Sequence, residues 1–140
     1  MPEVLEVREF AKFIKKYLKN KFIKNINILK GRYYRKPFEI NISFPIKVDD
    51  IKTKGKFLYF IFNNIYFFST LGLAGGWCFY KNINKKFIFP KIIDIKYQKI
   101  ILNNLNIAFH TDTGILYYYD TLSFGTFTAV RNSNAEHVNK

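Results

Sequence analysis

The sequence predicts an α+β fold in which an antiparallel β-sandwich packs against an N-terminal helix. Three observations lead to this prediction: one helical periodicity near the start, β-rich runs over the rest of the chain, and Asn or Gly residues between those runs. The chain has 140 residues, 49% of them hydrophobic, which is enough for the core of one domain. We expect this domain to span residues 1–130 and a polar tail to follow at residues 131–140.

The first predicted element is a helix from Val4 to Lys19. Its apolar residues recur every three or four positions and form one stripe, made of Val7, Phe10, Ala11, Ile14, Tyr17 and Leu18. The other face carries the lysines Lys12, Lys15, Lys16 and Lys19. We therefore expect the stripe to pack against the strands and the lysines to face solvent.

After the helix the pattern changes to that of strands. Residues 25–28 alternate between Asn and Ile, and Gly31 ends this alternation. A basic and aromatic stretch follows from Arg32 to Lys36. Two β-rich runs come next, Lys56 to Phe62 and Ile65 to Thr70.

Tight turns are predicted between the strands. Asn63-Asn64 tolerates positive φ and predicts a hairpin between the two β-rich runs. A second hairpin is expected at Asn103-Asn104, and a third around Asp112-Thr113-Gly114, which leads into a strand from Ile115 to Tyr119. The letters Asp-Thr-Gly also occur in aspartic proteases, but His110-Thr111 precedes them instead of an apolar strand, so a turn is the simpler interpretation.

The charge of the chain favours a polyanionic partner. Lys and Arg number 23 against 10 Asp and Glu, which gives a net charge of +13. The basic residues recur from Lys12 to Lys99 and do not sit in one tail. Nucleic acid and an anionic membrane surface both fit such a charge. No apolar stretch approaches the roughly 18–20 residues of a membrane span.

Cysteine and histidine are too scarce for a disulfide framework or a metal site. Cys78 is the single cysteine, which fits a reducing cytoplasmic or nuclear compartment. His110 and His137 are too few and too far apart in the chain to form a zinc site. We expect no metal and no other cofactor.

Pro2 is the candidate nucleophile. A proline after Met1 normally permits removal of the methionine, which leaves a secondary amine at the N-terminus. A terminal amine titrates near about 7.7–8.0 and lysine near about 10.4, so the terminal amine is the better nucleophile at neutral pH. Its attack on a sugar C1′ yields an iminium directly, and Glu3 is placed next to it as a proton donor. On these residues alone, an ordinary helix N-terminus is the simpler interpretation.

Four sequence motifs occur in a fixed order along the chain. Met1 to Val7 looks like M-P-E-G/L-P-E-V, Lys54 to Leu58 like the hairpin R/K-G-K-Y/F-L, Leu71 to Gly75 like L-G-M-T-G, and Asp120 to Gly125 like D-P-R-R-F-G. Together they resemble the formamidopyrimidine-DNA glycosylase and endonuclease VIII (Fpg/Nei) family. Arg32-Tyr33 and the region from Lys54 to Trp77 look like the eukaryote-type members found in large DNA viruses. The resemblance covers nearly the whole chain and implies the N-terminal catalytic domain of this family.

The resemblance implies a bifunctional DNA glycosylase and AP lyase of base excision repair. Pro2 would displace a damaged base and form a Schiff base with the sugar, and Glu3 would act as the acid/base beside it. Glu6 would be a supporting carboxylate. Lys56 would contact a phosphate and assist proton transfer, although an ordinary hairpin lysine is the alternative.

The candidate DNA-binding residues are Leu73, Phe124, Lys54, Arg32 and Arg35. Leu73 and Phe124 match family positions that enter the space left by a flipped nucleotide, and core packing is the alternative for both. Leu122 and Ser123 replace the two arginines of the family motif, so an intercalating guanidinium and a phosphate clamp are not expected here.

The family's second half, a helix-two-turns-helix domain with a zinc or zincless finger, has no match in these 140 residues. We therefore expect a catalytic half with weakened DNA affinity, because affinity arises largely from counterion release at each neutralised phosphate. A separately encoded helix-two-turns-helix domain is the candidate protein partner.

One alternative function is a non-catalytic module that binds single-stranded or distorted DNA through the basic, aromatic surface at Arg32 to Lys36. A weaker one is an anionic-membrane binder; we expect DNA and no membrane as partner.

Overall fold

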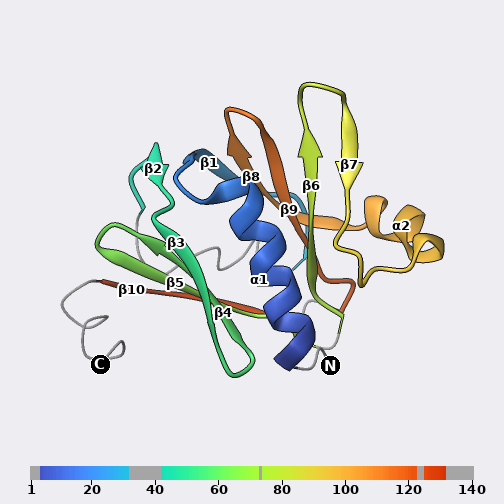
Figure 1. Cartoon of the computed structure of the whole chain (residues 1–140), viewed down its shortest axis with the longest axis horizontal. Helices are drawn as coiled ribbons and strands as arrows, with labels where there is room; N and C mark the ends of the chain where they lie inside the picture. Colours follow the sequence, from blue (N-terminus) through green and yellow to red (C-terminus); the bar gives the residue numbers. More distant parts are fainter. Residues whose placement is uncertain (1–3, 32–41, 73, 123–124, 132–140) are drawn as a thin grey trace.

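The computed structural model describes residues 4–31, 42–72, 74–122 and 125–131. In chain order its elements are α1 (Val4–Leu18), β1 (Phe22–Ile28), β2 (Ile46–Lys47), β3 (Asp50–Lys54), β4 (Phe57–Phe62), β5 (Ile65–Thr70), β6 (Gly76–Lys81), β7 (Lys86–Ile88), α2 (Ile95–Leu102), β8 (Leu105–Thr111), β9 (Gly114–Tyr119) and β10 (Thr126–Arg131). The strands form a six-stranded sheet of order β2-β1-β8-β9-β6-β7 and a four-stranded sheet of order β10-β5-β4-β3 (Figure 1). Every strand pairing is antiparallel, so the expected α+β sandwich is confirmed.

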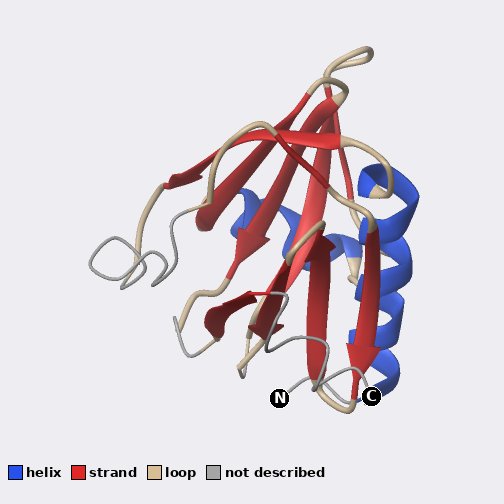
Figure 2. Ribbon diagram, turned by 90° about the vertical axis from the view of Figure 1, so that its left-hand side faces the viewer, coloured by secondary structure: helices blue, strands red, loops and turns tan. Residues whose placement is uncertain are grey.

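Helix α1 forms where the periodicity predicts it. Val7, Phe10, Ala11, Ile14 and Leu18 are buried, and each large apolar side chain contributes about 1.5–3 kcal/mol by leaving water. The helix ends just before Asn20, which adopts a positive φ of 65°. Figure 2 shows α1 running along one side of the strands, so its apolar stripe closes one side of the core.

The core between the sheets is largely aromatic. Phe60 and Phe67 come from the four-stranded sheet, and Trp77, Phe109 and Tyr118 come from the six-stranded sheet. The rings of Phe60 and Phe109 stack across the sandwich with centroids 5.9 Å apart, and those of Trp77 and Tyr118 lie 5.0 Å apart. This packing holds the two sheets in a defined relation, which in turn determines where their connecting loops meet.

The hairpin at Asn63-Asn64 is confirmed. Asn63 adopts a φ of 48°, and its backbone N–H donates to a carboxylate oxygen of Asp49 at 2.9 Å. The turn joins β4 to β5. Strand β3, which was not among the predicted β-rich runs, pairs with β4 through a turn at Gly55 with φ of 58°, where the resemblance of Lys54 to Leu58 implies a hairpin.

The hairpin predicted at Asn103-Asn104 is wrong. These residues follow α2, a second helix, and lead from it into β8. Asp94 caps the helix by accepting the backbone N–H of Lys96 at 3.1 Å. Ile101 of α2 packs on the outer side of the six-stranded sheet, and this tertiary contact stabilises the short helix.

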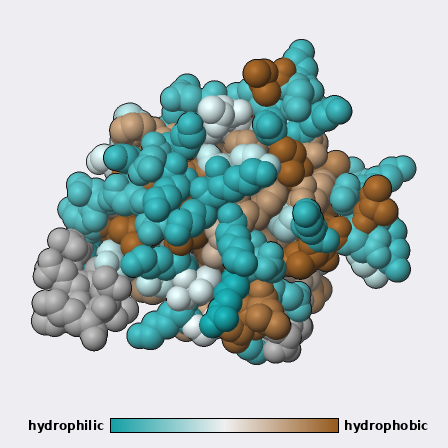
Figure 3. Space-filling model, in the orientation of Figure 1, coloured by the Kyte–Doolittle hydropathy of each residue, from teal (hydrophilic) through white to brown (hydrophobic). Residues whose placement is uncertain are grey.

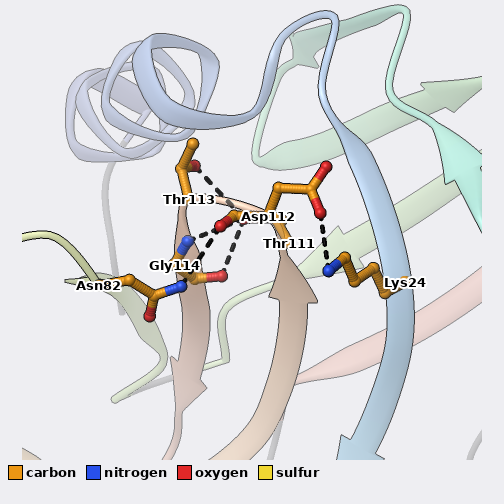
Figure 4. A network of polar contacts seen from close by, with 6 residues as sticks. All are labelled: Lys24, Asn82, Thr111, Asp112, Thr113 and Gly114. Atoms are coloured by element: carbon orange, nitrogen blue, oxygen red, sulfur yellow. Dashed lines mark hydrogen bonds and ion pairs between the residues drawn. The ribbon is translucent and has the colours of Figure 1, made fainter.

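The turn at Asp112-Thr113-Gly114 is confirmed and joins β8 to β9 (Figure 4). The Thr111 hydroxyl donates to the Gly114 carbonyl at 2.8 Å and accepts the Gly114 N–H at 3.2 Å. The Asp112 carboxylate forms an ion pair with Lys24 at 2.7 Å. These contacts give the Asp-Thr-Gly sequence a structural role in this turn.

The C-terminal boundary of the domain differs slightly from the expected one. Arg131, predicted to begin the tail, is the last residue of β10 and pairs with Ile65. Residues 132–140 lie outside the described residues. Neither of the two described helices has the length and apolar character that crossing a bilayer requires.

Candidate functional site

The segments that carry the four motifs meet at one end of the sandwich, which we call the motif end. Figure 1 shows that α1 begins, and the β3–β4 turn lies, at the same lower end of the molecule. Phe57, beside the β3–β4 turn, pairs with Thr70, which directly precedes the loop at residues 71–75. Thr70 in turn bonds to Thr126, which directly follows the loop at residues 120–125.

The structure describes only part of the predicted site. Its described members are Glu6, Lys54 and Lys56. The others lie outside the described residues: Pro2, Glu3, Leu73, Phe124, Arg32 and Arg35. The roles of these residues stay predictions.

Glu6 lies in the first turn of α1 and lines a cavity of about 540 Å³. The same cavity is lined by Phe10 of α1, Ala74 and Gly75 of the β5–β6 loop, Tyr97 and Ile101 of α2, Tyr119 of β9 and Thr121 of the β9–β10 loop. Three of the four motif segments therefore contribute to one cavity. An acidic side chain near a helix N-terminus is also favoured by the helix dipole.

The hydroxyl of Tyr119 is an unsatisfied polar group beside this cavity. Tyr119 is 5% exposed, and its hydroxyl has no hydrogen-bond partner among the described residues. Burial raises the pKa of Tyr119 well above its ordinary value of 10.0, with a smaller contribution from Cys78. The neutral hydroxyl can therefore donate to or accept from a bound group, and buried polar groups normally have such a partner.

Lys54 and Lys56 flank Gly55 in the turn between β3 and β4. Both lysines are exposed, as expected for side chains that contact phosphates. They line a second hollow, separate from the cavity of Glu6. The structure therefore brings the two lysines together and assigns Glu6 and Lys56 to different cavities of the motif end.

Asp120 anchors the β9–β10 loop. It is fully buried, and its carboxylate accepts the Tyr118 hydroxyl at 2.8 Å and the Gly125 N–H at 2.7 Å. Its backbone N–H donates to the side-chain oxygen of Asn106 at 2.7 Å. Asp120 therefore ties both ends of the last motif to the six-stranded sheet.

Asn106 is a residue of the motif end that sequence reasoning missed. It is 2% exposed and sits in a β-bulge, because β8 and β9 shift register between Leu105 and Ile107. Bulges of this kind re-aim side chains next to functional sites. Nothing in the local sequence reveals this bulge, whereas Asp120 could have been found as the first residue of a motif.

Thr70 and Thr126 link the two loops of the motif end. Their hydroxyl oxygens lie 2.7 Å apart, and the Thr126 N–H donates to the Thr70 hydroxyl at 3.0 Å. The Thr70 hydroxyl joins β5 to β10 where each strand meets its loop, so it positions the loops.

The described residues do not supply a metal site or a reactive cysteine. No three His, Cys, Asp or Glu side chains within residues 4–31, 42–72, 74–122 and 125–131 are grouped closely enough to hold a metal ion. Burial raises the pKa of Cys78 from 9.0 to about 12, so it stays a thiol at neutral pH.

The lysine face of α1 is largely engaged by acids. Lys15 and Lys19 lie 3.2 and 3.8 Å from a carboxylate oxygen of Asp50, and Lys12 lies 3.5 Å from Glu9. Figure 3 shows hydrophilic side chains over much of the face that carries α1, with apolar residues over the beginning of α1 and over α2. The apolar stripe of α1 packs in the core, as expected.

Comparison with known proteins places this architecture among DNA glycosylase domains. Residues 1–127 match the family model of the formamidopyrimidine-DNA glycosylase N-terminal domain. The formamidopyrimidine-DNA glycosylase of Mycoplasma mobile is 30% identical over 137 residues, which cover 91% of this chain and 43% of the relative. The enzyme of the same name from Shouchella clausii is 25% identical over 142 residues, covering 99% of this chain and 46% of the relative.

Solved structures of the same family share the fold. A complex between Lactococcus lactis Fpg and DNA with an abasic site aligns with a TM-score of 0.69 and 17% identity, over 99% of this chain and 46% of that chain. A non-covalent complex of the same enzyme with abasic DNA gives 0.68 and 18%, over 98% and 48%. The chain spans less than half the length of these relatives. It belongs to the formamidopyrimidine-DNA glycosylase family and matches the N-terminal domain.

Proposed function

We propose that this chain is the catalytic domain of a DNA glycosylase with AP lyase activity, acting on damaged or abasic DNA through an N-terminal Pro2. The observation that carries the proposal is the meeting of the motif segments at one end of the sandwich. Pro2 precedes Val4, the first residue of α1, by two residues, and α1 begins at that end. Family membership and the net charge of +13 support DNA as the partner.

The chemistry is nucleophilic catalysis by the terminal amine. The Pro2 nitrogen bonds to C1′ of the deoxyribose; at a damaged nucleotide the glycosidic bond breaks and the base departs with a proton. The C1′–O4′ bond then breaks and O4′ takes a proton, which gives the iminium; at an abasic site the same iminium forms with loss of water from C1′. The iminium acidifies the C2′ proton, whose removal expels the 3′ phosphate. A second elimination expels the 5′ phosphate, and hydrolysis of the imine frees the amine.

The remaining site residues act around this centre. Glu3 exchanges protons with the sugar, and Glu6 supports it as a second carboxylate from the cavity wall. Lys56 contacts a phosphate from the β3–β4 turn. Leu73 and Phe124 enter the space left by the flipped nucleotide, whose extrusion costs a few kcal/mol.

Abasic-site lyase activity ranks ahead of base excision for this chain. An abasic sugar is already free of its base, so its cleavage requires neither recognition of a lesion nor departure of a base. The relatives are more than twice as long, and DNA affinity scales with the number of phosphates contacted. A separately encoded helix-two-turns-helix domain is therefore the proposed partner for turnover on duplex DNA.

Borohydride trapping tests the nucleophile. The protein is incubated with a single-stranded oligonucleotide that has one abasic site, and borohydride reduces the imine to a stable crosslink. We expect a crosslink for the native chain after mass spectrometry has shown that Met1 is removed. A Pro2→Gly variant with one added N-terminal residue should form none, and a crosslink that survives this change would refute Pro2 as the nucleophile.

A non-catalytic DNA-binding module gives a different result in the same experiment. It predicts DNA retention that weakens with salt, no crosslink and no strand cleavage. Intact protein with a free Pro2 that binds abasic DNA but never crosslinks would favour this second function.

A further inference from the structure

The outer face of the four-stranded sheet carries aromatic side chains that the proposed chemistry does not use. Strand register sets these side chains in three rows across β3, β4, β5 and β10. The rows are Lys54, Phe57, Thr70 and Thr126; Lys52, Tyr59, Phe68 and Thr128; and Asp50, Ile61, Tyr66 and Val130. The alternate residues, such as Leu58, Phe60 and Phe67, fill the core on the other side.

The aromatic residues of these rows form one continuous surface. The ring centroids of Phe57 and Phe68 are 6.2 Å apart, those of Tyr59 and Phe68 5.2 Å, and those of Tyr59 and Tyr66 5.8 Å. The apolar cluster around Tyr59 and Tyr66 draws all its described members from β4, β5 and β10. No described apolar residue of α1 or α2 joins it, and Tyr59 and Tyr66 are each 8% exposed. Phe57 is 48% exposed.

A hollow of about 630 Å³ lies at the end of this face nearest the β3–β4 turn. Phe57 and Phe68 provide aromatic surface, Lys54 and Lys56 line it from the turn, and the hydroxyl residues Thr126 and Thr128 line it from β10. The described lining includes no carboxylate. Its volume lies within the roughly 300–1,000 Å³ of small-molecule sites.

The charges around the face favour an anion. Lys52 and Lys54 stand at exposed positions on β3, the edge strand of this sheet. Asp50, the acidic residue of the three rows, is engaged by Lys15 and Lys19 of α1. An aromatic surface edged by lysines matches the chemistry of a strand with stackable bases and a phosphate backbone.

We propose that this aromatic face, in which Phe57 and Phe68 line the hollow, Tyr59 and Tyr66 pack beside them, and Lys52 and Lys54 form the edge, binds single-stranded DNA. A base stacks on Phe57 and Phe68 in the hollow, and the backbone follows the lysines of β3. Bases of a duplex are already stacked on one another, so the face selects unpaired nucleotides. The site goes beyond the proposed Pro2 chemistry and does not depend on it.

A second copy of the chain is the less favourable occupant. Two chains that each carry +13 repel each other, and the lysines of one face would meet the same lysines of the other in a symmetric contact. Single-stranded DNA instead gains from every cation along β3, because each neutralised phosphate releases a counterion.

A tryptophan placed in the hollow tests the stacking directly. The native chain has one tryptophan, Trp77, which is fully buried and gives a constant background. We expect the fluorescence of a Phe57→Trp variant to be quenched when oligothymidylate of about 16 nucleotides is added. This length is the upper end of what one OB-fold domain binds on single-stranded DNA. The control is Phe87→Trp, because Phe87 is 37% exposed and lies on β7 of the other sheet. DNA binding without quenching at position 57, or equal quenching at position 87, would overturn the proposal.

Affinity measurements separate this site from the catalytic one. Phe57→Ala should weaken oligothymidylate binding by roughly 5- to 150-fold, the range that one stacked base is worth. Lys52→Glu should lower the slope of log affinity against log salt by about 0.7. The matched controls are Phe87→Ala and Lys86→Glu, which make the same chemical changes on exposed residues of β7.

The outcomes distinguish this proposal from the Pro2 proposal. Phe57→Ala should leave the borohydride crosslink intact at saturating DNA, and blocking Pro2 should leave oligothymidylate binding intact. If the β7 controls lose as much oligothymidylate affinity as the variants of the aromatic face, binding is unspecific charge attraction, and the proposal that the aromatic face binds DNA is overturned. The proposal is also overturned if sedimentation shows that the native chain is a dimer and that Phe57→Ala is a monomer. In that case a second copy of the chain occupies the aromatic face.

Discussion

Asp112 and Asp120 flank the same strand, β9, and yet have opposite environments. Asp112 precedes the strand, its side chain is 69% exposed, and it forms an ion pair with Lys24 at 2.7 Å. Asp120 follows the strand, is fully buried, and accepts hydrogen bonds from Tyr118 and Gly125. The difference shows that the carboxylate before the strand makes a solvated contact, whereas the carboxylate after it is held by buried hydrogen bonds.

The turn at Asp112 also has a buried polar group, the Thr111 hydroxyl, but this hydroxyl is bonded to Gly114. Asn106, Asp120 and the Tyr119 hydroxyl are all buried at the motif end, and the Tyr119 hydroxyl has no partner among the described residues. At the other end, Lys24, Asp112 and Asn82 are exposed. Burying polar groups is costly unless they are bonded, and proteins accept such costs mainly at functional sites.

Replacing Asp120 should have the largest effect. Asp120→Ala leaves the Tyr118 hydroxyl and the Gly125 N–H without this acceptor, so we expect a loss of about 2–4 kcal/mol in the free energy of unfolding. This loss is measured by urea unfolding monitored through the fluorescence of Trp77, because Trp77 packs against Tyr118. A loss below about 1 kcal/mol would mean that the buried carboxylate is not the anchor of the loop.

Replacing Asn106 should have the next largest effect. Asn106→Ala removes the acceptor of the Asp120 N–H and leaves a small cavity at the bulge, so we expect a loss of about 1–3 kcal/mol in unfolding free energy. The double variant with Asp120→Ala should lose less than the sum of the two single losses, because both residues belong to one network. Strict additivity in urea unfolding would contradict that coupling.

Asp50 is an intermediate case, because its side chain is 23% exposed. Burial alone would raise the pKa of Asp50, but the Ile51 N–H and the charges of Lys15 and Lys19 lower it below its ordinary 3.8. A lowered pKa means that the carboxylate stabilises the fold above about pH 4 and that this contribution is lost as the pH falls through the folded-state value. Asp50→Asn should therefore cost about 0.2–1 kcal/mol at pH 7.

The pH dependence provides the control for Asp50. The stability difference between the native chain and Asp50→Asn should shrink when urea unfolding is repeated below the ordinary pKa, and it should also shrink in high salt. A difference that stays constant at every pH would show that Asp50 acts through packing and not through its charge.

Replacing Asp112 should have the smallest effect. Asp112→Ala removes one exposed ion pair, so we expect at most about 0.5 kcal/mol in unfolding free energy. The yield of the borohydride crosslink should not change, since the β8–β9 turn lies at the end opposite the motif segments. A loss as large as that of Asp120→Ala would erase the difference between the two ends.

Sequence periodicity predicted the elements that have strong local signals. The stripe of α1 and the Asn63 turn were found because each depends on residues close in the chain. Helix α2 was missed because Ile95 and Ile100 are exposed, so its eight residues lack a clear buried stripe. Strand β3 was missed because Ile51 is its one buried residue.

The sequence motifs supplied the candidate site residues, whose roles stay predictions. Glu6 lines one cavity of the motif end, and Lys54 and Lys56 line the second hollow. Asn106 and the Tyr119 hydroxyl were not found, because their importance depends on a bulge and on burial. Neither property can be derived from neighbours in the chain.

The sequence by itself determined the helical stripe, the turn residues and the identity of the motif side chains, since these depend on local conformational preference and residue chemistry. Only the tertiary structure decided that Glu6 shares a cavity with Gly75 and Thr121, while Lys54 and Lys56 share a hollow with Phe57 and Phe68. The physical reason is that strand register and the packing of the aromatic core, which join residues far apart in the chain, determine which side chains meet.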